Sequence, residues 1–76
     1  MEALLKLILE NIVTDKDSLK IEEVNQDGYI VYELELSDED KGLVIGSKGK
    51  NIKAIRNILS IIAKREGQRV NISIKD

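Results

Sequence analysis

The stretch that decides the fold is GLVIGSKGKNIKAIR, residues 42–56. It contains a GxxG element in which Gly46 and Gly49 enclose Ser47 and Lys48, and it carries four basic residues and no acidic residue. Glycine lacks a Cβ atom, so a pair of glycines permits both a tight turn and a close approach of the backbone to a ligand. We therefore interpret the GxxG element as a tight cationic turn between two regular elements.

Both elements that flank this turn are predicted to be helices. Upstream, Ser37 and Asp40 resemble a capping box in which Asp replaces Glu, which predicts a short helix over residues 38–45. Downstream, residues 50–65 repeat apolar side chains at helical spacing, and Gly67 follows as an end signal. The apolar stripe of this longer helix comprises Ile52, Ile55, Leu59, Ile62 and Ala63.

The rest of the chain supplies one more helix and three strands. Residues 2–13 have helical periodicity. A short strand around Ile21 and Val24 leads to the turn NQDG, whose Asp-Gly pair favours a β-hairpin. Residues 29–37 and 69–75 alternate apolar and polar side chains, as half-buried strands do. The positions expected to face the core are Leu4, Leu5, Ile8 and Ile12 in the helix, and Ile30, Tyr32, Leu34, Leu36, Val70, Ile72 and Ile74 in the two longer strands.

The predicted order of elements, α-β-β-α-α-β, defines an α+β fold. A hairpin followed by a strand-helix-helix-strand crossover gives a mixed three-stranded sheet whose last pair is parallel, with the three helices covering one face. A chain of 76 residues with 42% hydrophobic content is long enough for one small domain and too short for two. We therefore expect residues 1–76 to form a single domain.

Composition excludes several classes of function. The chain contains no Cys and no His, which excludes disulfides and His/Cys metal sites and is compatible with a reducing cytoplasm. No stretch approaches the roughly 20 apolar residues that a membrane-spanning helix needs. Tyr29 and Tyr32 are the only aromatic residues, so an aromatic platform of the RRM kind is not expected. We expect a cytoplasmic protein without membrane insertion, metal or cofactor.

The formal net charge of −2 conceals a strong asymmetry along the chain. Residues 1–40 contain 3 Lys and 12 Asp or Glu, a charge of −9, whereas residues 41–65 contain 5 Lys, 2 Arg and no acid, a charge of +7. A run of like charge usually marks a solvated face. Here the positive block surrounds a glycine turn, which favours a site for a polyanion.

Residues 44–52, VIGSKGKNI, resemble the signature of the K homology (KH) domain: an apolar pair, a GxxG loop and an apolar residue three positions later. The element order resembles the type II KH topology, and the resemblance covers essentially the whole chain. The small size of the chain and the sequence of residues 42–56 resemble those of the bacterial KhpA family of small RNA-binding proteins. This resemblance implies single-stranded RNA binding without catalysis, as a post-transcriptional regulator or RNA chaperone. It also implies self-association or pairing with a larger KH-containing partner of the KhpB/Jag type.

The chemistry of a phosphate clamp can be assigned to the loop and to the helix that follows it. Gly46 and Gly49 allow the backbone to approach a phosphate, and the free N–H groups and dipole of the helix N-terminus favour an anion. Ser47 and Lys48 form the loop tip, and Lys50 adds charge just inside the helix. Lys53 and Arg56 continue the positive track at i, i+3 spacing. Alternatively, the glycines serve only as helix cap and turn, which leaves the basic block unexplained.

By resemblance to KH domains, a base-binding groove lies between the two loop-flanking helices and an adjacent strand. The matching residues are Gly42, Ile45 and Ile52, with Gly42 leaving room; plain core packing of the two isoleucines is the alternative. The segment 66–69 occupies the place of the variable loop and is short. A site of this size is expected to bind about four nucleotides, and to bind them weakly.

A second surface of the longer helix is a candidate for self-association. Ile61 and Ala54 fall on the side of the helix that faces away from the core, with Ile58 alongside, so Ile61 should be exposed in a monomer. These three residues could make a self-complementary two-fold contact. A single exposed isoleucine is also ordinary on a protein surface. Leu7, off the apolar stripe of the first helix, is a weaker candidate.

Readings from other classes fit less well. A P-loop nucleotidase would need GxxxxGK[ST], but Gly42 and Gly46 are too close and Ser47 precedes Lys48. No His is present to activate Ser47 as a nucleophile, so we expect no enzyme activity. The serious alternative is a KH-fold interaction module that contributes a dimer surface and binds little RNA itself. The KH family often has a base where Ser47 stands, which affects the expected affinity more than the mode. The sequence leaves open RNA against single-stranded DNA, and homodimer against hetero-complex.

Overall fold

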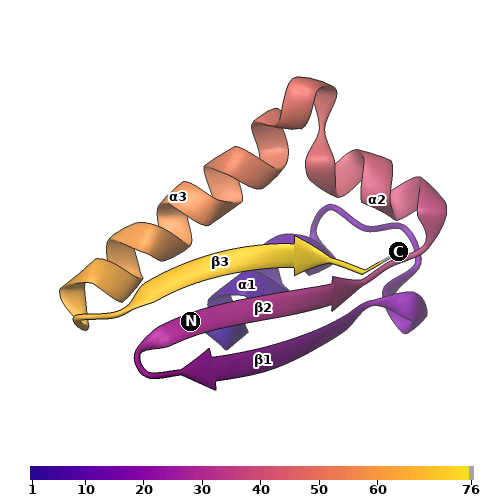
Figure 1. Cartoon of the computed structure of the whole chain (residues 1–76). Coiled ribbons are helices and arrows are strands. Elements are labelled where there is room, and N and C mark those ends of the chain that lie inside the picture. The colour runs from indigo at the N-terminus through magenta and orange to yellow at the C-terminus, as the bar shows by residue number, and fades with distance from the viewer. Residues whose placement is uncertain (76) are drawn as a thin grey trace.

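The computed structural model describes residues 1–75 and has the predicted α+β order, α-β-β-α-α-β. Figure 1 shows three helices and a three-stranded sheet. The regular elements are α1 (Glu2–Glu10), β1 (Lys20–Gln26), β2 (Tyr29–Glu35), α2 (Asp38–Ile45), α3 (Lys50–Arg65) and β3 (Arg69–Ile74), with two single-turn 3-10 helices, η1 (Lys16–Ser18) and η2 (Ser47–Gly49). The bounds predicted for the two helices on either side of the glycine loop agree with α2 and α3. No helix in this described part of the chain is long and apolar enough to cross a membrane.

The sheet has the strand order β1-β2-β3, with β2 in the centre. β1 and β2 pair antiparallel around a turn in which Asp27 and Gly28 both have positive φ angles, 51° and 82°. This is the backbone that tight hairpins favour, because its twist matches that of the strands. β2 and β3 pair parallel, so that Tyr29 is the register partner of Arg69. The predicted mixed sheet is confirmed, and the crossover between its parallel strands consists of α2, the glycine loop and α3 (Figure 1).

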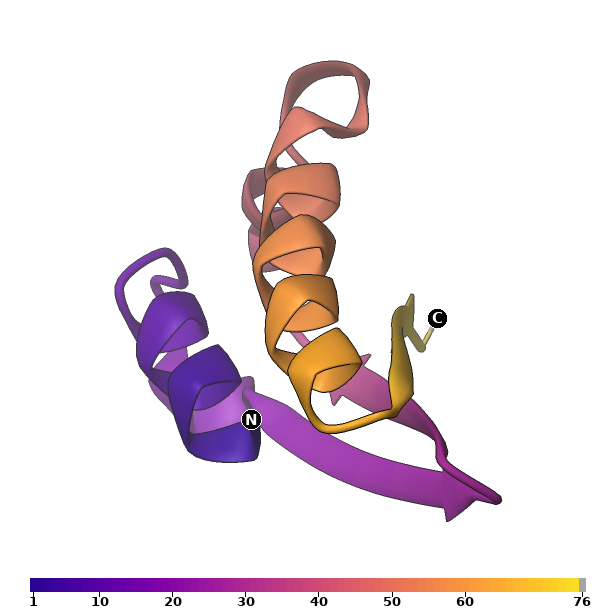
Figure 2. The same cartoon turned by 90° about the vertical axis from the view of Figure 1, so that its left-hand side faces the viewer.

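The helices cover one face of the sheet and enclose an aliphatic core (Figure 2). The inner face of β2 contributes Ile30, Tyr32 and Leu34, all of which are buried as predicted. The Tyr32 hydroxyl donates a hydrogen bond to Glu23 Oε1 at 2.8 Å. Burial, together with this bond, raises the pKa of Tyr32. The buried hydrophobic residues that the other elements supply are Leu5, Leu9, Val13, Val44, Ile55, Leu59, Ala63 and Ile72.

The first helix is shorter than the predicted span of residues 2–13. α1 ends at Glu10, and Asn11 caps it by donating from Nδ2 to the Leu7 carbonyl at 2.7 Å. After Asn11 the chain makes one further tight turn, in which the N–H groups of residues 12 and 13 both donate to the Leu9 carbonyl. This tightening turns Val13 into the core. Leu9, which the predicted apolar face omitted, is fully buried one turn after Leu5.

Asp40 makes hydrogen bonds that the predicted capping box does not include. Ser37 Oγ accepts a hydrogen bond from the Asp40 N–H at 3.2 Å, as a capping box requires. The Asp40 carboxylate does not complete the box; it accepts from Thr14 N, Thr14 Oγ1 and Asp15 N, each at 2.9 Å. Asp40 is fully buried, and the two backbone N–H donors lower the pKa of its carboxyl group. This contact ties the segment after α1 to α2, and thereby fixes the helix that leads into the glycine loop.

Candidate nucleic-acid interface

The glycine loop has a backbone that few residues other than glycine adopt easily. Gly46 has φ 75° and ψ 176°, and Gly49 has φ 75° in the left-handed helical region. Lys48, between them, also has a positive φ, 55°. Left-handed backbone is disfavoured for L-residues because Cβ crowds the carbonyl group. The loop therefore makes a sharp turn in which the lysine at its tip occupies a strained conformation.

Gly46 is further constrained by Asn51, a residue that sequence reasoning did not single out. A Cβ atom placed on Gly46 would lie 2.6 Å from Asn51 Cγ. Asn51 in turn donates from Nδ2 to the Leu43 carbonyl at 2.9 Å, which links the first turn of α3 to the last turn of α2. The close packing of Asn51 across the loop leaves no room for a side chain at Gly46. Because Asn51 contacts Gly46 and Leu43 across the loop, no local pattern in the sequence marks this role of Asn51.

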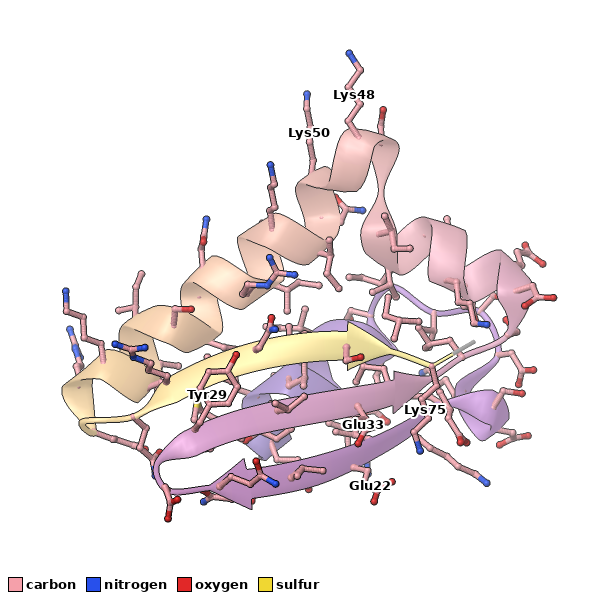
Figure 3. All side chains as sticks on the ribbon, viewed as in Figure 1. Glu22, Tyr29, Glu33, Lys48, Lys50 and Lys75 are labelled. Atoms are coloured by element: carbon pink, nitrogen blue, oxygen red, sulfur yellow. The ribbon has the colours of Figure 1, made fainter. Side chains whose placement is uncertain are left out.

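The N-terminus of α3 has no side-chain cap at the loop, although the Lys50 N–H donates to the Ser47 carbonyl of η2. Its cap residue, Gly49, has no side chain that could accept from the first N–H groups, and the first turn contains no acidic residue. The first N–H groups of any helix have no partner inside that helix, and they carry the positive end of the helix dipole. Lys48 and Lys50 project from this apex of the molecule into solvent (Figure 3). The arrangement can receive an anion.

The basic side chains of the glycine loop and of α3 are in no ion pair with another residue of the described chain. Within residues 1–75, every ion pair uses Lys20, Lys41 or Lys75, so none involves a base of the loop or of α3. Lys48, Lys50 and Lys53 are exposed. Arg56 differs, because it is half-buried and its Nε is shielded without an acceptor among the described residues. The predicted positive track would therefore consist of three exposed lysines and one arginine that lies partly against the protein.

The three predicted groove residues lie in different environments. Gly42 is exposed on α2, and an added Cβ would meet nothing within 4 Å. Ile45 is 39% exposed, so it is not a core residue. Ile52, by contrast, is half-buried and packs against the margin of the core. Open apolar surface thus exists next to the loop at Ile45 on α2, while Ile52 on α3 packs against the core.

The outward face of α3 carries the residues predicted for self-association. Ile61 is 61% exposed and Ile58 is 45% exposed, and Ala54 is also exposed. The expectation that Ile61 is exposed in a single copy of the chain is confirmed. Leu7 on α1 is exposed to a similar extent, 59%. The role of this face in self-association stays a prediction.

The acidic residues of the sheet lie away from the loop (Figure 3). Glu22 and Glu33 occupy the face of the sheet that the helices leave uncovered, and Lys75 reaches them there (Figure 3). Lys75 Nζ lies 3.3 Å from Glu22 Oε2, 3.9 Å from Glu33 Oε2 and 3.8 Å from Glu35 Oε1. The hydrogen bond to Glu22 and the surrounding carboxylates raise the pKa of Lys75. The carboxylates of the sheet and the lysines of the glycine loop therefore lie on different parts of the molecule.

Comparison with known proteins assigns the family. The family model described as "KhpA/KhpB, KH domain" matches residues 2–74. The RNA-binding protein KhpA of Chlamydia pneumoniae is 37% identical over 76 residues, which cover 100% of this chain and 97% of that protein. The RNA-binding protein KhpA of Clostridium acetobutylicum is 36% identical over 74 residues, 97% of this chain and 99% of that protein. That of Aquifex aeolicus is 30% identical over 74 residues, 97% and 94% of the two chains. The chain therefore belongs to the KhpA family of KH-domain proteins.

Proposed function

We propose that this protein binds single-stranded RNA, with the loop from Gly46 to Gly49 acting as a clamp on the phosphate backbone. The observation that carries the proposal is the glycine loop at the N-terminus of α3, which has no side-chain cap and lies beside lysines in no ion pair within the described chain. Relatives that match the whole chain are named RNA-binding proteins. A KH fold with this loop grips about four nucleotides.

The clamp combines three contributions. The glycines let phosphate oxygens reach the backbone, and the positive end of the α3 dipole attracts them, although the Lys50 N–H itself donates to Ser47. Lys48 and Lys50 supply charge that can follow a moving phosphate, because a lysine ammonium sits on a flexible stem. Lys53 and Arg56 then continue the contact along the helix. Bases turned away from the phosphates would lie over Gly42, Ile45 and Ile52.

The acidic residues on the uncovered face of the sheet also favour binding of RNA at the glycine loop rather than at the sheet. Glu22, Glu33 and Glu35 repel a polyanion from the uncovered face, although Lys75 offsets part of their charge. Segregated charge of this kind steers an approaching strand toward the positive side and accelerates its association. The steering weakens at high salt, because ions screen exposed charges.

The proposal is tested by the binding of a fluorescent single-stranded RNA pool to the wild type and to Ser47→Asp/Lys48→Asp. The matched control, Ala3→Asp/Lys6→Asp, makes the same charge change on the exposed side of α1. We expect the loop variant to lose binding and the control to retain it, with circular dichroism showing that both are folded. Equal binding by the loop variant and the wild type would overturn the clamp. A competing single-stranded DNA pool distinguishes the two nucleic acids.

We also propose that two copies associate through the outward face of α3, around Ile61. The exposed apolar residues Ala54, Ile58 and Ile61 support this second role. A larger KH-containing partner of the KhpB/Jag type is the alternative occupant. Sedimentation of Ile61→Asp tests the contact, with Asn25→Asp as the control because it adds the same charge at an exposed position of β1 outside the apolar face of α3. An unchanged oligomeric state in Ile61→Asp would exclude the self-association.

If the loop variant and the wild type both fail to bind RNA while the Ile61 face still associates, the interaction-module function replaces RNA binding.

As an RNA-binding protein without catalytic activity, the chain would act in the cytoplasm as a post-transcriptional regulator or RNA chaperone. Cell fractionation tests the location. Strand-annealing assays with and without the loop variant test the chaperone activity.

A further inference from the structure

A hollow lies at the end of α3 far from the glycine loop, where the helix turns into β3. Its volume is about 520 Å³. The residues that line it are Tyr29, Ser60, Lys64, Gly67, Gln68, Arg69 and Val70. They come from the start of β2, the last turns of α3 and the start of β3, and the parallel pairing of β2 with β3 brings these segments together. We propose that this hollow binds one further nucleotide of the RNA strand held by the loop.

Tyr29 provides a surface on which a base can stack. It is 41% exposed, whereas the chain's other aromatic residue, Tyr32, is buried and hydrogen-bonded to Glu23. Tyr29 stands at the end of the sheet away from Lys75 (Figure 3). Stacking on an exposed aromatic ring holds an unpaired base without reading its sequence, because every base has a π-face.

Two basic side chains in the hollow can contact the phosphate group of the nucleotide. Lys64 and Arg69 are both exposed, and neither is in an ion pair within residues 1–75. Arg69 is the register partner of Tyr29 on the neighbouring strand, so cation and ring start from adjacent backbone positions. An aromatic ring with cations beside it matches a nucleotide, which has a flat base next to a charged phosphate.

The walls of the hollow are held in place by the backbone. Gly67 N donates to the Lys64 carbonyl at 3.2 Å and Gln68 N to the Ala63 carbonyl at 2.8 Å, which closes the end of α3 with both bonds of a Schellman motif. On the other side, β3 is an edge strand. The N–H groups of Arg69 and Lys75 donate toward β2, whereas the Ile72 N–H donates to Asn71 Oδ1 and so faces the free edge. Val70, two residues earlier, therefore also presents its backbone groups to the free edge, inside the hollow.

A polar stripe on α3 connects the loop to the hollow. Lys53, Ser60 and Lys64 are separated by seven and four positions, which places them on one side of the helix. This side differs from the core side, which carries Leu59, and from the outward side, which carries Ile61. At about 1.5 Å per residue, Ser60 lies roughly 15 Å along the axis from Lys50 and Lys64 roughly 21 Å. A strand that leaves the clamp along this stripe reaches the hollow beyond the nucleotides that the loop holds.

The inference rests on the proposed RNA binding, and an experiment with two RNA lengths separates the two ideas. The probes are oligoadenylates of about four and about eight nucleotides, the shorter one matched to a single KH site. We expect the wild type to bind the longer probe about tenfold more tightly, which is typical of one added stacking contact. Tyr29→Ala and Lys64→Gln should lose this gain and keep their affinity for the shorter probe. Tyr29→Phe, which keeps the ring, should retain the gain.

Arg65→Gln is the matched charge control, because Arg65 is exposed beside Lys64 but does not line the hollow. An equal loss in Arg65→Gln and Lys64→Gln would overturn the inference, and so would a persistent gain in Tyr29→Ala. Either result leaves the clamp intact, since the shorter probe still binds. Absence of binding to both probes by the wild type would instead overturn the proposed function, and the inference with it.

Tyrosine fluorescence gives an independent measurement. The chain contains no Trp and only two Tyr, so its emission reports on Tyr29 and Tyr32 alone. We expect the longer probe to quench the emission of the wild type more than the shorter probe does, and the difference to vanish in Tyr29→Phe. Quenching by free adenosine monophosphate that is unchanged in Ser47→Asp/Lys48→Asp, without a length effect, would identify a separate mononucleotide site and overturn the assignment to the same strand.

Discussion

Asp40 Oδ1 accepts two hydrogen bonds from one residue, Thr14, whose N–H and hydroxyl both lie 2.9 Å away. Thr14 is 26 positions earlier in the chain, so this contact holds α2 against the segment that follows α1. We expect Asp40→Ala to lower the melting temperature by on the order of 10 °C, because it removes three hydrogen bonds made by a fully buried carboxylate. Thermal unfolding followed by circular dichroism measures it. Glu39→Ala, on the exposed side of the same turn, is the control and should change little.

The same carboxylate makes stability depend on pH in the acid range. The N–H groups of Thr14 and Asp15 lower its pKa below the ordinary value of about 3.9. Its contribution is therefore present above that value and is lost as the pH falls through the lowered pKa. Urea unfolding at pH values from about 6 to about 2 should show a steeper loss in the wild type than in Asp40→Asn. Parallel curves for the two proteins would contradict this assignment.

Gly46 should tolerate substitution less well than Gly49. An alanine at Gly46 suffers both the positive φ and the contact with Asn51 Cγ at 2.6 Å, whereas an alanine at Gly49 would find only Ile52 Cγ2 at 4.0 Å. We expect Gly46→Ala to cost at least about 2 kcal/mol and Gly49→Ala about 1 kcal/mol. Chemical denaturation measures both. Asn51→Ala added to Gly46→Ala should recover the steric part of the loss, and no recovery would place the whole cost in the backbone angle.

Gly42 allows stability and binding to be separated. It lies inside α2, where nothing approaches the position of an added Cβ. Gly42→Ala should therefore stabilise the fold by about 0.5–1 kcal/mol, since glycine is a poor helix former. If a base lies over this position, the same variant should bind RNA more weakly. Denaturation and RNA titration of one preparation measure both effects, and unchanged affinity would remove Gly42 from the groove.

The salt dependence of binding counts the phosphate contacts. Four contacts, from Lys48, Lys50, Lys53 and Arg56, predict a log–log slope of about −2.8, because each contact with a single strand contributes about −0.7. Lys53→Gln should reduce the steepness by about 0.7. Titrations of labelled RNA at several salt concentrations give the slope. A slope near zero would argue against any clamp on the phosphates.

The parts of the fold that were predictable are those marked by local residues. Gly46 and Gly67, together with the Ser37 cap, fixed the bounds of α2 and α3, because turn and capping residues act over a few positions. The end of α1 was misplaced, since Asn11 is a weaker signal and the apolar pattern continues to Val13. Local signals locate elements well and their ends less well.

The features that were missed depend on residues far apart in the chain. The partner of Asp40 is Thr14, and nothing near Asp40 indicates it. The hollow at Tyr29 and Lys64 exists only because β2 and β3 pair in one particular register. The GxxG element, by contrast, lies within four consecutive residues and was visible at once. A site made of consecutive residues can be found in a sequence, whereas a site assembled by packing needs the structure.

The hydrogen bond from Asn51 to the Leu43 carbonyl determines what a ligand must do to bind. It joins the two helices on either side of the loop, so the loop's ends are fixed before any strand arrives. A segment that already has its bound shape loses little conformational entropy on association. Binding to such a loop should be governed by how fast a strand finds it and how fast it leaves, rather than by a slow rearrangement of the protein. If the loop clamps RNA as proposed, a small chain with few contacts would exchange rapidly among many strands and contact each of them with the same pre-shaped turn.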